Sequence, residues 1–302
     1  MSMISPREVL KQIASALPEE CRGSVIIIGS LAAGYHYFRD DPESVVQTKD
    51  VDCMLSPYIE AVHTGKAVAE RLFREKWRFH KNPEWDKPGT SDTPLEKLPL
   101  VRLDPPEGAE WFLELMASPP DTGGNGKQLF RLETNQGHFA LCSFGYLALV
   151  QEKPALTEYG VHVARPEMMA LANLLHHPFI REERMSGPIE DRSIKRSNKD
   201  LGRVLAIAYL ATAKDPDALL DWADVWAEAL HACFGNKFSA LCSRAGDGLR
   251  QLLGSAVDME EAAYTCAYGL LRSHRPTVEQ LEIAGKRLVQ DALDPLKTMG
   301  KK

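Results

Sequence analysis

The segments "IIIGSLAAGYHYF" (residues 26–38) and "KDVDCML" (residues 49–55) decide how the N-terminal half of the chain is interpreted. The first begins with isoleucines, reaches a Gly-Ser pair and continues with small residues, which predicts a buried strand followed by a helix. The second alternates apolar residues with Asp50 and Asp52, which predicts another strand with both carboxylates on one face. Two like charges inside an otherwise apolar strand require a physical explanation.

Asp50 and Asp52 repel each other when they lie side by side in a medium of low dielectric constant. A divalent cation between the two carboxylates removes this repulsion. Mg²⁺ prefers carboxylate oxygens and keeps coordination positions for phosphate and water. The residues alone also allow a second interpretation, in which both side chains lie on the solvated face of an edge strand.

Glu114 is a third acid, and it lies in the apolar segment "WFLELMA" (residues 111–117). An isolated glutamate in such a strand is unfavourable unless it is paired or bound to a metal. If this segment pairs beside residues 48–55, three acids on two neighbouring strands suit a centre of two metal ions about 3.5–4 Å apart. The alternative is a salt bridge from Glu114 to Arg102 or to Arg131.

Gly29 and Ser30 end the first strand and begin the helix. The first amides of a helix have no partner within the helix and carry partial positive charge, so they can hold a phosphate group. Glycine allows the backbone to turn and to approach a phosphate closely. Ser30 adds a hydroxyl donor, and the pair is therefore predicted to bind a phosphate group.

The order of these features resembles the DNA polymerase β-type nucleotidyltransferase superfamily: strand, Gly29-Ser30, helix, strand with Asp50-x-Asp52, and a later strand with Glu114. The resemblance implies that the Gly-Ser pair binds the triphosphate and that the three acids are catalytic and hold two Mg²⁺ ions. It also implies transfer of NMP from an NTP to an acceptor hydroxyl. The acceptor stays open between an RNA end such as that of a tRNA, a protein and a small molecule.

The C-terminal half carries a second resemblance. Pro166 and Glu167 begin one helix-like segment, and Arg196, Lys199 and Asp200 begin the next. This arrangement is similar to that of the abortive-infection (AbiEii-like) toxins of toxin–antitoxin pairs, which implies an antitoxin protein as a partner. Lys199 is the first choice for a catalytic and nucleotide-binding cation, and Arg196 the second, because a transferring phosphoryl group carries charge that a cation must offset.

Several residues of this half have alternative interpretations. Asn173 stands where the toxin group usually carries a lysine. Lys199 and Asp200 equally suit the start of a helix, with a solvated lysine and an acid that interacts favourably with the helix dipole. His176 and His177 have no recognisable partner for binding a metal, so they are predicted to cap the end of a helix.

The chain has 302 residues, of which 44% are hydrophobic and 26% charged, and these values are typical of a globular protein with two domains. The predicted fold class is α+β. Residues 1–165 form a nucleotidyltransferase-like domain with a mixed sheet and flanking helices, and residues 166–302 form an all-helical domain. Between two of the predicted helices, residues 178–198 are expected to be a charged, mobile connection.

The composition also limits the function. The formal net charge of −6 gives no overall attraction to nucleic acid. No segment resembles a signal peptide or a membrane span, and the six scattered cysteines predict reduced, buried thiols in a cytoplasmic protein. The main alternative to the enzyme is a non-catalytic protein of the same fold that binds a nucleotide or has a regulatory role.

Overall fold

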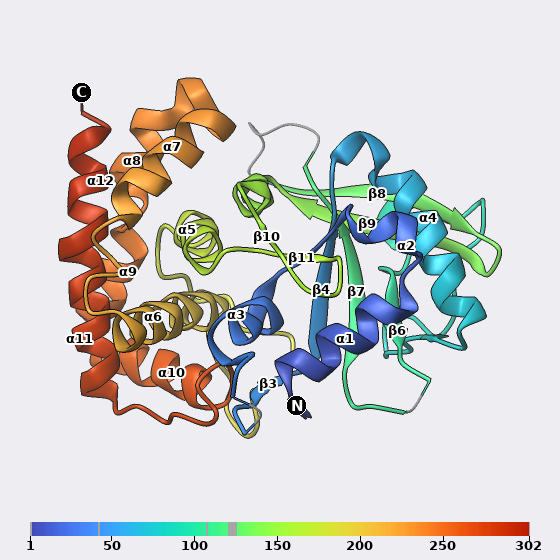
Figure 1. The fold of residues 1–302 in the computed structure, drawn as a ribbon, viewed down its shortest axis with the longest axis horizontal. Helices are drawn as coiled ribbons and strands as arrows, with labels where there is room; N and C mark the ends of the chain where they lie inside the picture. Colours follow the sequence, from blue (N-terminus) through green and yellow to red (C-terminus); the bar gives the residue numbers. More distant parts are fainter. Residues whose placement is uncertain (1, 42, 107, 120–125, 302) are drawn as a thin grey trace. The chain divides into compact units, whose positions relative to one another are not determined.

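The structure is a computed structural model that describes residues 2–41, 43–106, 108–119 and 126–301 (Figure 1). The chain divides into two units, and each is described here by itself. The first unit comprises Met1–Glu43 and Thr48–Ala164, and the second comprises Ser44–Gln47 and Arg165–Lys302. The sequence predicted a division after residue 165.

The first unit is built on a mixed sheet. The strand order is β10-β11-β2-β4-β7-β6-β5, and β9 pairs with both β7 and β8. The β11–β2, β4–β7 and β7–β9 pairs are parallel, and the other pairs are antiparallel. The strands are β2 (Val25–Ile27), β4 (Asp50–Leu55), β5 (Arg78–Phe79), β6 (Arg102–Asp104), β7 (Phe112–Ala117), β8 (Lys127–Thr134), β9 (Gly137–Phe144), β10 (Ala155–Leu156) and β11 (His162–Val163).

Both segments that decide the fold have the predicted secondary structure, with shifted boundaries. The isoleucine strand β2 ends at Ile27, and α3 (Gly29–Phe38) follows at once. The predicted strand within residues 49–55 is β4, and a short strand β3 (Val46–Thr48) precedes it, with Lys49 between the two. A short strand β1 (Ser2–Ile4) precedes the first helix.

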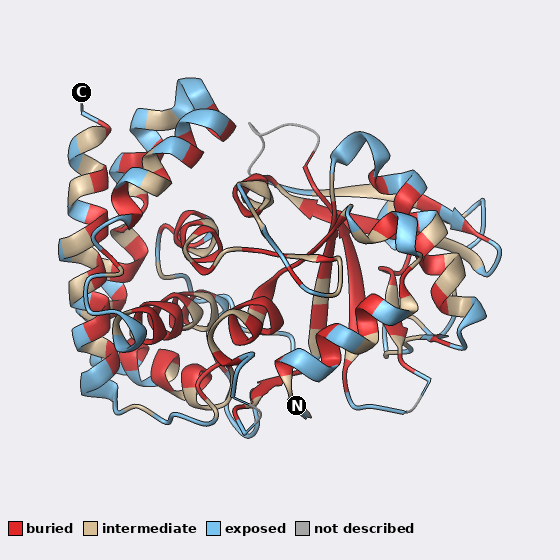
Figure 2. Cartoon of the chain, viewed as in Figure 1, coloured by how far each residue is buried: buried red, intermediate tan, exposed pale blue. Residues whose placement is uncertain are grey.

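The two faces of the sheet differ in character. On β4, Val51, Cys53 and Leu55 are completely buried, whereas Asp50 and Asp52 are half-buried. Helix α4 (Tyr58–Arg74) packs on the apolar face, because a Cβ built on its Gly65 would lie 2.9 Å from Leu55 Cδ1. Figure 2 shows β4 and β7 as mostly buried strands. The remaining helices of this unit are α1 (Pro6–Ala16) and α2 (Glu19–Arg22), with 3₁₀ segments at Leu95–Lys97 and Gly145–Gln151.

The second unit consists mainly of helices, and this confirms the predicted helical C-terminal region. Its long helix α6 packs against α5, α10 and α11, and most of its residues are buried (Figure 2). The helices are α5 (Pro166–His176), α6 (Arg196–Lys214), α7 (Trp222–Phe234), α8 (Phe238–Arg244), α9 (Asp247–Leu253), α10 (Ala256–Ala267), α11 (Val278–Leu288) and α12 (Asp294–Met299), with a π-helical segment at Val289–Leu293.

The remaining sequence expectations concern thiols and membranes. All six cysteines are buried and none forms a disulfide. Within the described ranges, no helix is both long enough and apolar enough to traverse a bilayer. The sheet and the helices together confirm a mixed α/β architecture with a helical C-terminal region. The nucleotidyltransferase fold itself stays a prediction.

Candidate active site

The three predicted acids of the first unit lie on adjacent strands. Strands β4 and β7 pair in parallel, with Asp52 directly opposite Glu114 and Asp50 opposite Phe112. Side chains of directly paired residues leave the same face of a sheet. Asp50 shares that face because it is two residues from Asp52. The structure thus brings Asp50, Asp52 and Glu114 together as the sequence predicted.

Asp50 and Asp52 are held by different contacts. The Thr48 hydroxyl donates to Asp50 Oδ1 over 3.1 Å, and also to the Asp50 carbonyl oxygen over 3.0 Å. The carbonyl of Asp52 accepts a hydrogen bond from the Ile28 amide at 3.0 Å. This last bond fixes the end of β2, and with it the start of α3, beside the carboxylate of Asp52.

Gly29 makes the close approach that glycine permits. Its φ is +73°, and a Cβ built on it would lie 3.0 Å from Asp52 Oδ2. This is the left-handed region of backbone conformation, in which side chains are unfavourable. No side chain caps the start of α3, and its first turn, which includes Ser30, contains no acid. The amide end of this helix therefore lies next to the acidic pair.

Glu114 is engaged by the alternative partner that the sequence allowed. Arg102 Nε donates to Glu114 Oε2 over 2.6 Å, in a pair whose glutamate side chain is 9% exposed. Arg131 instead donates to the backbone carbonyls of Thr90 and Thr93. Arg102 takes up one oxygen of Glu114, so a metal at this residue would bind Oε1 or displace Arg102.

A buried thiol lies on the other side of this glutamate. Cys142 Sγ is 3.6 Å from Glu114 Oε1. Burial, together with the negative charge of Glu114, raises the pKa of the Cys142 thiol. The thiol is therefore protonated at neutral pH when no metal is bound.

The carboxylate pair has the donor chemistry of a magnesium site. Asp50 and Asp52 offer only oxygen ligands, they are half-buried and they share one face of the sheet. Hard divalent cations prefer such ligands. These two residues are the first candidates to hold Mg²⁺, with Glu114 as a third.

The predicted cations Arg196 and Lys199 lie in the second unit, in the first turn of α6. Arg196 is exposed, its amide donates to the Glu183 carbonyl over 2.9 Å, and its Nε lies 3.5 Å from Glu183 Oε1. Lys199 is half-buried, and its charge acts on Asp200 in the same helix. Their roles toward a nucleotide stay predictions.

The second unit contains a contact that sequence reasoning missed. His177 Nε2 lies 2.7 Å from Asp200 Oδ2, which joins α5 to α6. Burial alone would raise the pKa of Asp200, but the His177 hydrogen bond and the charges of Lys199 and Arg203 hold this pKa below its usual range. His177 also caps α5 as predicted, because its amide donates to the Asn173 carbonyl.

The same residues form a weak candidate for a metal site. One ligand atom each from His176, His177 and Asp200 lies within 4.8 Å of the other two. The charges of Lys199 and Arg203 also act on Asp200, and cations so close oppose the binding of another cation. The geometry is better explained by a hydrogen bond that joins two helices.

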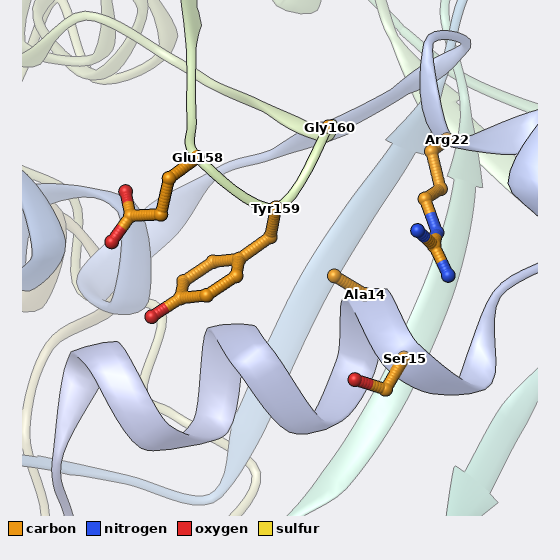
Figure 3. Close-up of a pocket in the computed structure, with 6 residues that line it drawn as sticks. All are labelled: Ala14, Ser15, Arg22, Glu158, Tyr159 and Gly160. Atoms are coloured by element: carbon orange, nitrogen blue, oxygen red, sulfur yellow. The ribbon is translucent and has the colours of Figure 1, made fainter.

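An open pocket of about 390 Å³ lies elsewhere in the first unit (Figure 3). Two of its polar groups are already bonded, since the Tyr35 hydroxyl donates to Glu158 and Arg7 donates to the Tyr159 hydroxyl over 3.2 Å. The buried Nε of Arg22 has no hydrogen-bond partner in the part of the chain that the structure describes. None of the predicted site residues lines it. Its lining consists of Ala14, Ser15, Arg22, Glu158, Tyr159 and Gly160.

Comparison of the chain with protein-family models, with curated proteins and with solved structures found no match. The geometry of the residues therefore has to support any functional proposal.

Proposed function

We propose that the protein is a Mg²⁺-dependent nucleotidyltransferase that moves NMP from an NTP to an acceptor hydroxyl. One observation carries the proposal: Asp52 lies opposite Glu114 on the face that also carries Asp50, and Gly29 adopts a φ of +73° against the Asp52 carboxylate. An acidic pair beside an uncapped helix start offers both a cation site and a phosphate site.

The chemistry follows from these positions. The amides at the start of α3 and the Ser30 hydroxyl would bind the β- and γ-phosphates, and Asp50 and Asp52 would hold Mg²⁺. The acceptor oxygen attacks the α-phosphorus, a new P–O bond forms and the bond to the β-phosphate oxygen breaks. Pyrophosphate leaves, and the hydroxyl proton passes to water. Mg²⁺, when bound, offsets the charge that develops on the phosphoryl oxygens.

The first experiment removes one carboxylate charge at a time. Asp50→Asn and Asp52→Asn are expected to lower NMP transfer and pyrophosphate release from an NTP by about a hundredfold or more, since transition-state charge is no longer offset. Purified protein is incubated with each α-labelled NTP, Mg²⁺ and a mixture of total RNA and protein acceptors. Glu60→Gln on the exposed start of α4 is the control and keeps wild-type activity. Retained transfer in either Asp variant contradicts the proposal.

A second candidate function is a non-catalytic nucleotide sensor. The 2.6 Å contact between Arg102 and Glu114 favours it, because this contact occupies the third acid. Thermal shift with each NTP separates the two functions. Stabilisation that requires Mg²⁺ and is accompanied by pyrophosphate release supports the transferase, whereas metal-independent stabilisation without turnover supports the sensor.

A role as a toxin held by an antitoxin stays a prediction from the resemblance. Growth of cells that express the wild-type chain or Asp52→Asn tests it. Growth arrest by the wild type alone supports a toxin, and harmless expression of both contradicts one.

A further inference from the structure

The face of the sheet that carries the acids continues across four strands as a polar face. Strand pairing places its residues in two rows that run from β4 through β7 and β6 to β5, and His80 extends β5 because its amide donates to the Arg102 carbonyl. Acids predominate at the β4 end, and a histidine and arginines lie toward the β5 end. The first row is Asp52, Glu114, Arg102 and His80, and the second is Asp50, Phe112, Asp104 and Arg78.

An ordered ring stack lies beside the acids. The His80 ring stacks on the Phe112 ring with centroids 4.2 Å apart, and Arg102 Cζ lies 5.4 Å from the same Phe112 centroid. His80 Nδ1 is 2.6 Å from Asp104 Oδ1, which holds the imidazole in this orientation. Its Nε2 makes no hydrogen bond within the described part of the chain, and the His80 side chain is 28% exposed.

The order of the strands determines from which side of β4 an acceptor would approach the acids. Gly29 approaches Asp52 from β2, and β2 lies on the opposite side of β4 from β7, β6 and β5. In an in-line displacement the attacking oxygen and the leaving pyrophosphate lie on opposite sides of the phosphorus. If the triphosphate occupies the start of α3, the acceptor comes from the β6–β5 side, where His80 and Phe112 are stacked.

Distance and chemistry favour a nucleoside as the acceptor. Neighbouring strands are about 4.8 Å apart, so His80 and Glu114 are separated by roughly 10 Å across two strand steps. Arg102 lies between them in the same row, so a sugar would reach from the stacked ring to the acids over the Arg102 side chain. Planar heterocycles stack on aromatic and histidine rings, and the exposed Arg78 suits a phosphate attached to that sugar.

We propose that His80 and Phe112, supported by Asp104 and Arg102, form an acceptor subsite that stacks the base of a nucleoside and directs its hydroxyl toward the acids. The inference that the acceptor approaches from the β6–β5 side rests on the proposed transferase function. The stack, the oriented imidazole and the exposed edge of the sheet support base binding independently of it.

The test measures binding without NTP or Mg²⁺, using the full chain and the four free ribonucleosides as probes in saturation-transfer NMR. At least one ribonucleoside is expected to bind the wild type. His80→Ala is expected to raise the dissociation constant of this ribonucleoside about tenfold or more, because the stack of the base on the His80 ring is lost. His80→Phe keeps a stacking ring but loses the contact with Asp104, and it is expected to retain most of the binding. Exposed His63 on α4 provides the control variant His63→Ala, which binds as the wild type does.

The outcomes distinguish the subsite from the transferase. The subsite is overturned if His80→Ala binds ribonucleosides as well as the wild type does, or if no ribonucleoside binds. Either result overturns it even when the protein transfers NMP to some acceptor. Preferential binding of tyrosinamide instead assigns the acceptor to protein and also overturns it. Ribonucleoside binding that depends on the ring at position 80, without any NMP transfer, leaves the subsite standing and removes the transferase. Circular dichroism melts of His80→Ala and His80→Phe show whether each variant is folded.

Discussion

Gly29 is the residue whose backbone conformation determines how closely α3 approaches the acids. Alanine at this position would be strained at a φ of +73°, and its Cβ would lie 3.0 Å from Asp52 Oδ2. We expect Gly29→Ala to lower the free energy of unfolding by about 1–2 kcal/mol and to weaken NTP binding. Urea denaturation measures the first effect and equilibrium NTP binding the second.

Gly23 offers a matched control. It has a helical φ of −63°, and a Cβ built on it meets nothing within 4 Å. Gly23→Ala is expected to leave stability within about 0.5 kcal/mol of the wild type. If both substitutions have the same effect, the close approach at Gly29 does not explain the loss.

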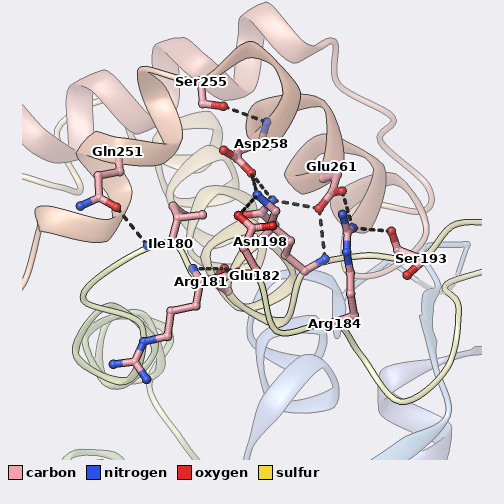
Figure 4. Close-up of polar contacts among 12 residues, drawn as sticks. Ile180, Arg181, Glu182, Arg184, Ser193, Asn198, Gln251, Ser255, Asp258 and Glu261 are labelled. Carbon is pink, nitrogen blue, oxygen red and sulfur yellow. Dashed lines mark hydrogen bonds and ion pairs between the residues drawn. The ribbon is translucent and has the colours of Figure 1, made fainter.

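At the scale of elements, the polar contacts of α10 hold the segment that was expected to be mobile (Figure 4). Asn198 Nδ2, which is completely buried, donates to Asp258 Oδ1 over 2.8 Å and to Glu261 Oε2 over 2.9 Å. Glu261 also accepts from Arg184 Nη1 at 2.7 Å and from the Lys195 amide at 3.1 Å. Residues of the segment 178–198 therefore make specific hydrogen bonds and ion pairs with α10.

We expect Glu261→Gln to lower the free energy of unfolding by about 1–2 kcal/mol, because a charged acceptor of several hydrogen bonds is lost. The loop should also be cut faster by trypsin at Arg181, Arg184 or Arg192. Glu260→Gln, an exposed neighbour on α10, is the control. Equal cleavage rates in the two variants would show that Glu261 does not hold the segment.

The same cluster predicts a dependence on pH. Burial alone would raise the pKa of Asp258, but hydrogen bonds from Ser255, Asn198 and Lys195 lower it, and the pKa of Glu261 is lowered in the same way against its burial. Acids with lowered pKa values stabilise the fold above their unfolded pKa, about 4, and lose this contribution as the pH falls below it. The difference in stability between wild type and Glu261→Gln should therefore be full at pH 7 and shrink below pH 4, as measured by urea denaturation at each pH.

The sequence predicted those features that depend on local pattern. The isoleucines, the Gly-Ser pair and the alternation around Asp50 specify β2, α3 and β4 within a few residues. The pairing of Arg102 with Glu114 depends on the register between β6 and β7, so the sequence could only name Arg102 as one of two partners. Local pattern does not identify His80, because the strand that it follows, β5, has only two residues and shows no alternation. Asp200 is 23 residues from His177, and only the packing of α5 on α6 brings them together.

At the scale of the whole molecule, the acidic pair should lower stability when no cation is bound. Asp50 and Asp52 share one face of β4, and Arg102 forms an ion pair with Glu114 on the neighbouring strand. Asp50→Asn keeps an oxygen that can accept from Thr48 and removes one of the repelling charges. In EDTA, the melting temperature of Asp50→Asn is therefore expected to equal or exceed that of the wild type, as is common for a functional site that is not optimised for stability.

Addition of Mg²⁺ should reverse this order. A cation that binds only the folded state at about a hundred times its Kd adds roughly 2.7 kcal/mol, which corresponds to several degrees in a chain of this length. The wild type is expected to gain this stabilisation and Asp50→Asn to lack it, whereas Asp86→Asn at an exposed position should respond as the wild type does. Calorimetry with and without Mg²⁺ measures each response. If Asp50→Asn is less stable in EDTA and gains as much from Mg²⁺ as the wild type, Asp50 stabilises the strand and does not bind the metal.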